Sequence, residues 1–104
     1  MNKSSLKLGS AAIAAAASLV VAGCVNVSSL DCNEIAERAK GISQEQPVKI
    51  ESIANVREIS RTDNDARCTG EATLANGAGT APVYLRAYEE GGNTIVAYQG
   101  TPFP

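Results

Sequence analysis

"ARCTGEATL" at residues 66–74 alternates strictly between small or apolar side chains and polar ones. A period of two is the pattern of a β-strand that buries one face. The apolar set contains Cys68 and Gly70 and has little bulk, so it leaves room for a helix to pack against it. The stretch therefore predicts a sheet with a helix on one face.

A helix is predicted upstream of this strand. Asp31 and Glu34 stand three residues apart and form a capping box, with Asp31 as the N-cap. Gly41 is expected to end the helix, which then spans residues 32–40. Its apolar side chains recur at helical spacing and comprise Cys32, Ile35, Ala36 and Ala39.

The rest of the chain is predicted to form strands. Residues 48–59 change their apolar spacing from two to three, so we expect a bulge or bend within 52–55. Residues 61–65 form a polar turn, and the turn at Asn76 continues through residue 81. The last two strands flank the turn at residues 90–93. The predicted class is α+β: one N-terminal helix packed on a three- to four-stranded antiparallel meander sheet.

The first residues have the order of a secretory signal peptide. Lys3 and Lys7 precede an uncharged run over residues 8–23, which is short for a bilayer span of about 20 residues. The run ends in VAGC, residues 21–24. This stretch resembles the lipobox of bacterial lipoproteins, in which an aliphatic residue and two small residues precede the cysteine that is processed. Val at the first position is a mild departure, because Leu is commoner there.

The resemblance implies cleavage after Gly23 and a lipid on Cys24. It divides the chain into a signal peptide (1–23), a lipidated tether (24–30) and one α+β domain (31–104). The lipid would anchor the chain to the cell membrane, or to the outer membrane facing the periplasm if the host has two membranes, because Val25 rather than Asp follows Cys24. An uncleaved anchor and a cysteine placed by chance are the alternatives. The mature part is also similar to small bacterial lipoprotein domains with a disulfide-tied helix and sheet.

The two other cysteines form an even pair in an exported chain. Cys32 and Cys68 are therefore predicted to form a structural disulfide. Their wide separation does not fit a Cys-x-x-Cys redox pair. No metal is expected, because the chain has no His and two thiols fall short of a zinc shell.

Catalytic signals are weak. With no His and no nucleophilic thiol left over, neither enzymatic activity nor a cofactor is expected. The net charge of −2 argues against nucleic acid as a partner. Residues 63–65 read Asp-Asn-Asp but fit a calcium loop poorly, because Arg67, Cys68 and Leu74 stand where such a loop needs a ligand, a Gly and a Glu. A solvated turn is the simpler interpretation.

One surface is a candidate binding face. If Leu85 and its alternate neighbours face the helix, then Tyr84, Arg86 and Tyr88 face away, beside Arg67 and Tyr98. Tyr and Arg are enriched at binding hot spots, although aromatic pairs also stabilise exposed sheets without binding anything.

These features predict a membrane-anchored cell-envelope lipoprotein with a small binding domain and an envelope protein as its partner. One alternative is an accessory structural lipoprotein without a discrete site. Another is an inhibitor of an envelope-targeting enzyme.

Overall fold

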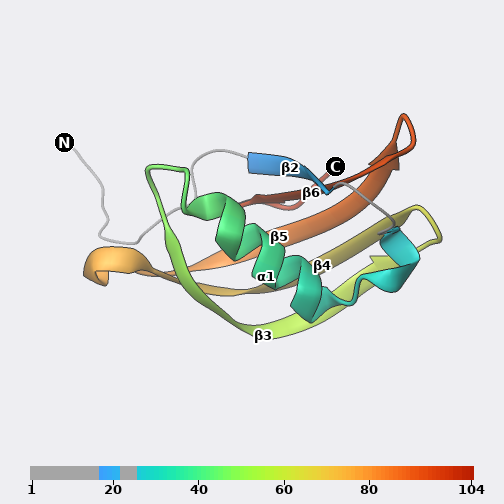
Figure 1. Ribbon diagram of the computed structural model, residues 1–104. Helices are drawn as coiled ribbons and strands as arrows, with labels where there is room; N and C mark the ends of the chain where they lie inside the picture. The colour runs from blue at the N-terminus through green and yellow to red at the C-terminus, as the bar shows by residue number, and fades with distance from the viewer. Residues whose placement is uncertain (1–16, 22–25) are drawn as a thin grey trace.

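The computed structural model describes residues 17–21 and 26–104. Its strands are β2 (Ala17–Val21), β3 (Ile50–Arg61), β4 (Asp65–Leu74), β5 (Gly79–Glu90) and β6 (Asn93–Gln99). They form one antiparallel sheet in the order β2-β6-β5-β4-β3. The helix α1 (Cys32–Ser43) crosses one face of this sheet (Figure 1). Strands β3 to β6 form a meander, so the predicted α+β class is confirmed, and β2 adds a fifth strand beside β6.

The N-terminus of α1 forms as predicted. The Glu34 amide donates to Asp31 Oδ1 at 2.8 Å, and the Asp31 amide donates to Glu34 Oε1 at 3.3 Å, which completes a capping box. Ile35, Ala36 and Ala39 are buried against the sheet. The spacing of its apolar residues therefore determines which face of α1 packs against the core.

The predicted end of α1 at Gly41 is wrong, because the helix continues to Ser43. The hydroxyl of Ser43 donates to the Lys40 carbonyl at 2.7 Å and accepts from the Ile50 amide at 2.9 Å. The side-chain Nε2 of Gln44 donates to the Lys40 carbonyl at 3.0 Å and to the Ile50 carbonyl at 3.1 Å. These side chains satisfy the free Lys40 carbonyl in the last turn and bond the end of the helix to the start of β3. A left-handed glycine is therefore not needed to end the helix.

Strand β3 is an irregular edge. Its pairing with β4 shifts register at three places, between residues 50 and 52, 54 and 57, and 58 and 60. Asn55 has φ of 56°, which marks the middle shift. The predicted bulge over residues 52–55 is therefore present, and two further shifts accompany it. Ile59 is 58% exposed, so its place in the apolar spacing does not bury it.

The two hairpins that follow set the register of the sheet. The loop between β4 and β5 contains the 3-10 turn η2 (Ala75–Gly77) and ends sooner than predicted, because Leu74 pairs with Gly79. Between β5 and β6, Gly91 and Gly92 have φ of 61° and 82°, as a two-residue turn of type I′ requires. This tight turn places Glu90 opposite Asn93 and fixes every later pair.

The core lies between α1 and one face of the sheet. Sheet residues that are fully buried there include Cys68, Val83, Leu85 and Val96. Cys32, the first residue of α1, is bonded to Cys68 in β4 with their Cα atoms 5.9 Å apart. The predicted disulfide is confirmed, and it joins the helix to the sheet at the helix N-terminus.

Candidate functional site

The outer face of the sheet, opposite α1, carries the predicted aromatic and basic side chains. Tyr84, Arg86 and Tyr88 are half-buried, whereas their alternate neighbours in β5 lie in the core. Arg67 in β4 is the register partner of Arg86. We call the four residues Arg67, Tyr84, Arg86 and Tyr88 the tyrosine-arginine face.

Tyr98 does not belong to this face, which corrects the predicted set. It pairs with Leu85, whose side chain points to α1, and it is only 2% exposed. Burial raises the pKa of its phenol. The turn at residues 91–92 decides which face Tyr98 takes, and a one-residue change in register would reverse it.

Asp65 holds the arginines of the tyrosine-arginine face in position. Its carboxylate accepts from Arg86 Nη2 at 2.6 Å and from Arg86 Nε at 3.1 Å. Arg67 Nε donates to the same carboxylate at 3.3 Å. The bonds from Arg86 keep the pKa of Asp65 below its ordinary value, and the same pair raises the pKa of Arg86. The guanidinium of Arg86 also lies 4.2 Å from the ring centre of Tyr88.

The last residues of the chain lie against this face. Arg67 Nη1 donates to the main-chain oxygens of Pro104 at 2.7 Å and Phe103 at 3.5 Å. Gln99 donates to the carbonyls of Thr101 and Pro102. Arg67 is thus engaged by both the sheet and the C-terminal segment. The sequence carries no local signal for this contact, because it joins residues far apart in the chain.

A shallow open groove adjoins the tyrosine-arginine face. Its volume is about 540 Å³, and it lies on β3, β4 and β5. Asn55 Nδ2 donates to Glu71 Oε1 at 3.0 Å along its side. The bulge at Asn55 therefore helps to shape the groove, whose lining is Asn55, Arg57, Thr69, Gly70, Glu71, Pro82 and Tyr84.

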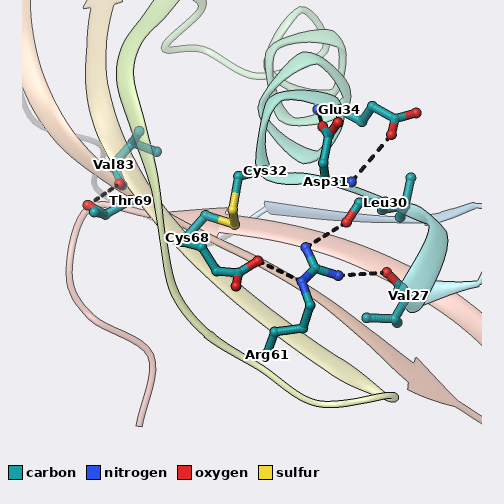
Figure 2. Close-up of a disulfide and its surroundings, with 10 residues drawn as sticks. Val27, Leu30, Asp31, Cys32, Glu34, Arg61, Cys68, Thr69 and Val83 are labelled. Atoms are coloured by element: carbon teal, nitrogen blue, oxygen red, sulfur yellow. Dashed lines mark hydrogen bonds and ion pairs between the residues drawn. A yellow bond between two sulfur atoms is a disulfide. The ribbon is translucent and has the colours of Figure 1, made fainter.

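A second feature is the end of the domain that follows the predicted lipid site (Figure 2). The 3-10 turn η1 (Val27–Ser29) precedes α1, and both Val27 and Leu30 are buried in the core. Arg61 Nη1 donates to the Val27 carbonyl at 3.1 Å, and Nη2 donates to the Leu30 carbonyl at 2.7 Å. Glu58 accepts from Arg61 Nε at 2.6 Å.

This anchored end falls within residues 24–30, the segment predicted as a tether. Val27 is part of the core, and Arg61 holds its carbonyl. The sequence does not predict this packing, because Val27 has only Val25 and Leu30 as apolar neighbours and no longer periodic pattern continues through it. The predicted lipid site, Cys24, lies outside the described residues.

Polar groups in the turn at residues 63–65 form bonds to other residues of the domain. The Asp65 carboxylate is used by the arginines, and its carbonyl accepts from the Thr62 amide at 2.7 Å. The Asn64 carbonyl accepts from the Glu89 amide at 3.1 Å. Within the described part of the chain, no three side chains of the His, Cys, Asp or Glu type gather as a metal site would require.

Comparisons with protein families, curated proteins and solved structures find no match to this chain. None of the helices in the described ranges is both long and apolar enough to span a membrane.

Proposed function

We propose that the chain is a cell-envelope lipoprotein that is cleaved after Gly23 and anchored through a lipid on Cys24. The VAGC stretch after an uncharged run supports this assignment. The disulfide is also consistent with export, since such bonds persist in oxidising compartments. In a host with two membranes, the lipid would hold the domain at the outer membrane, facing the periplasm.

The anchor would keep the domain close to the bilayer. Only Val25 and Asn26 separate Cys24 from the buried Val27. Three extended residues reach about 10 Å. A partner would therefore have to be another component at the same membrane surface or one that comes to it.

The lipid is tested by a Cys24→Ser variant. This variant loses its acylation site and should stay unprocessed or leave the membrane. Mass spectrometry of the N-terminus reads the outcome directly. An unmodified Cys24 in membrane-extracted protein would contradict the proposal, and a mass that still includes residues 1–23 would favour the uncleaved anchor.

At the membrane, the domain binds an envelope protein through the tyrosine-arginine face. The observation that carries this function is Arg86, which Asp65 and Tyr88 hold from two sides. A side chain that is already ordered loses little conformational entropy on binding. Tyr and Arg supply the large contacts that dominate interfaces. The face suits a partner that offers both apolar and acidic groups.

The binding function is tested in cells with a photo-cross-linking residue in place of Tyr84. We expect one discrete adduct, which a Tyr88→Ser substitution weakens. The matched control is the same probe at Thr73, which is also half-buried in the sheet but lies toward the other end of β4. The proposal is supported if Tyr88→Ser weakens the adduct of the Tyr84 probe and leaves any adduct of the Thr73 probe unchanged. If no site gives an adduct, the accessory structural lipoprotein is favoured, and an adduct with an envelope-attacking enzyme favours the inhibitor.

A further inference from the structure

The two edges of the sheet differ in how they are protected. Natural sheets prevent unwanted pairing with charges, Pro and bulges on their edge strands. The β3 edge has such features, with three register shifts and the charged residues Glu51, Arg57, Glu58 and Arg61. By contrast, β6 reads NTIVAYQ, which contains no charge and no Pro. Its register with β5 continues without a shift over the whole strand.

The β6 edge is covered by the chain's own N-terminal segment. Strand β2 pairs with it antiparallel from Ala17 opposite Tyr98 to Val21 opposite Thr94, with Leu19 opposite Val96 at the centre. This strand lies wholly within residues 1–23. Cleavage after Gly23 would remove it, and the mature chain would have an uncharged strand at the edge of its sheet.

We propose that a second copy of the mature chain takes the place of β2 and pairs its own β6 with this edge. The inference rests on the proposed processing. The new pair is antiparallel and twofold symmetric, with Val96 opposite Val96 and Ile95 opposite Ala97. It uses residues 94–98, the same five that pair with β2.

The hydrogen-bonding pattern of the hairpin selects this register. In a two-residue hairpin the residues that flank the turn, here Glu90 and Asn93, form a hydrogen-bonded pair, and such pairs then alternate along the strands. Ile95 and Ala97 therefore direct their backbone groups toward β5, whereas Val96 directs its own toward β2. In a twofold pair, Val96 meets Val96 as a hydrogen-bonded pair, and Ile95 meets Ala97 as a pair without hydrogen bonds.

A second copy fits this edge better than a foreign chain. A strand without charge offers nothing for a charged partner to complement. The antiparallel arrangement is self-complementary, as a twofold interface requires. Its axis is perpendicular to the sheet, so both copies carry α1 on the same face. Anchoring to one membrane also raises the effective concentration of each copy near the other.

The test is a disulfide cross-link in the processed protein within its own membrane. The double variant Ile95→Cys, Ala97→Cys places thiols opposite each other across the symmetric pair. Opposed residues without hydrogen bonds have Cα atoms about 4.5 Å apart, which a disulfide can bridge. Mild oxidation should yield a covalent dimer on a non-reducing gel, and each single variant should remain monomeric.

Two controls separate pairing at this edge from random collision. The variant Glu58→Cys, Ser60→Cys has the same spacing on the opposite edge strand, β3, and should not form the dimer. The double variant combined with Cys24→Ser retains β2 if processing needs the cysteine, so its β6 edge stays covered and no dimer should form. Intact mass establishes processing in every sample.

The outcomes are distinct. A dimer from processed Ile95→Cys, Ala97→Cys protein, absent from the β3 control, supports the inference. Processed protein that stays monomeric overturns the inference and leaves the proposed lipoprotein intact. Protein that retains residues 1–23 in the wild-type background overturns both. Equal dimer formation by the β3 control overturns the pairing through β6.

Discussion

Ile53 occupies the space that a side chain on Gly70 would need. A Cβ on Gly70 would lie 2.8 Å from Cγ2 of Ile53 and 3.1 Å from the carbonyl oxygen of Ala54. Ile is branched at Cβ, so it has little freedom to turn away. Gly70 therefore allows the bulged part of β3 to close over β4, and it brings Asn55 to the groove beside the tyrosine-arginine face.

A Gly70→Ala substitution should lower the free energy of unfolding by about 1–3 kcal/mol, the usual cost of overpacking. Gly41→Ala is the matched control, because no atom lies within 4 Å of its added Cβ and the residue is in the interior of α1. That change should raise the free energy of unfolding by about 0.5–1 kcal/mol. Urea denaturation measures both. A Gly70→Ala protein as stable as wild type would show that Ile53 and Ala54 of β3 do not pack closely against Gly70.

The parts of the fold that the sequence predicts are those with local causes. The alternation at residues 66–74 and the capping box at Asp31 each involve neighbours in the chain, and both form as expected. The end of α1 was not predictable in this way, because Ser43 is satisfied by Ile50 from the next strand. Gly41 by itself gave the usual signal for a helix end.

The residues of the candidate site likewise differ in whether their placement has a local cause. Tyr84, Arg86 and Tyr88 share a face because they alternate within one strand. Tyr98 lies on another strand, and its face depends on the exact length of the turn before it. The ion pair between Asp65 and Arg86 has no local signal in the sequence, because the two residues lie on neighbouring strands.

The ion pair at Asp65 predicts how stability responds to acid. The pKa of Asp65 is lower in the folded chain than in the unfolded chain, where it is about 3.9. Its contribution is therefore fully present above that value and is lost as the pH falls through the folded pKa. An Asp65→Asn variant should be less stable at neutral pH, by at most about 1 kcal/mol, and should lose less stability than wild type on acidification.

Melting temperatures at pH 6 and at pH 2.5 test this dependence. Asp63→Asn is the control in the same turn, because Asp63 makes no ion pair among the residues that the structure describes. The interpretation fails if Asp65→Asn and Asp63→Asn respond to acid alike.

Arg61 predicts a second measurable effect, at the anchored end. Its two terminal nitrogens serve the carbonyls of Val27 and Leu30 separately. A Lys ammonium is a compact charge on a flexible stem and does not reproduce the rigid fork that gives each acceptor its own nitrogen. Arg61→Lys should therefore lower the free energy of unfolding by about 1–2 kcal/mol and expose residues 27–31 to proteolysis. Arg57→Lys on the same strand lines the open groove and should change neither quantity. Equal effects of the two substitutions would rule out a specific role for Arg61.

The disulfide holds the same end of the domain as Arg61, and the two should act together. Replacing Cys32 and Cys68 by Ser should lower the free energy of unfolding by about 2–5 kcal/mol. Because both contacts order the segment that leads into α1, adding Arg61→Lys should cost a different amount with and without the disulfide, by more than about 0.5 kcal/mol. Thiol labelling checks the bond itself: native wild-type protein should resist labelling at both cysteines until it is reduced. Ready labelling before reduction would contradict the bridge, and strictly additive losses would mean that Arg61 and the disulfide hold the anchored end independently.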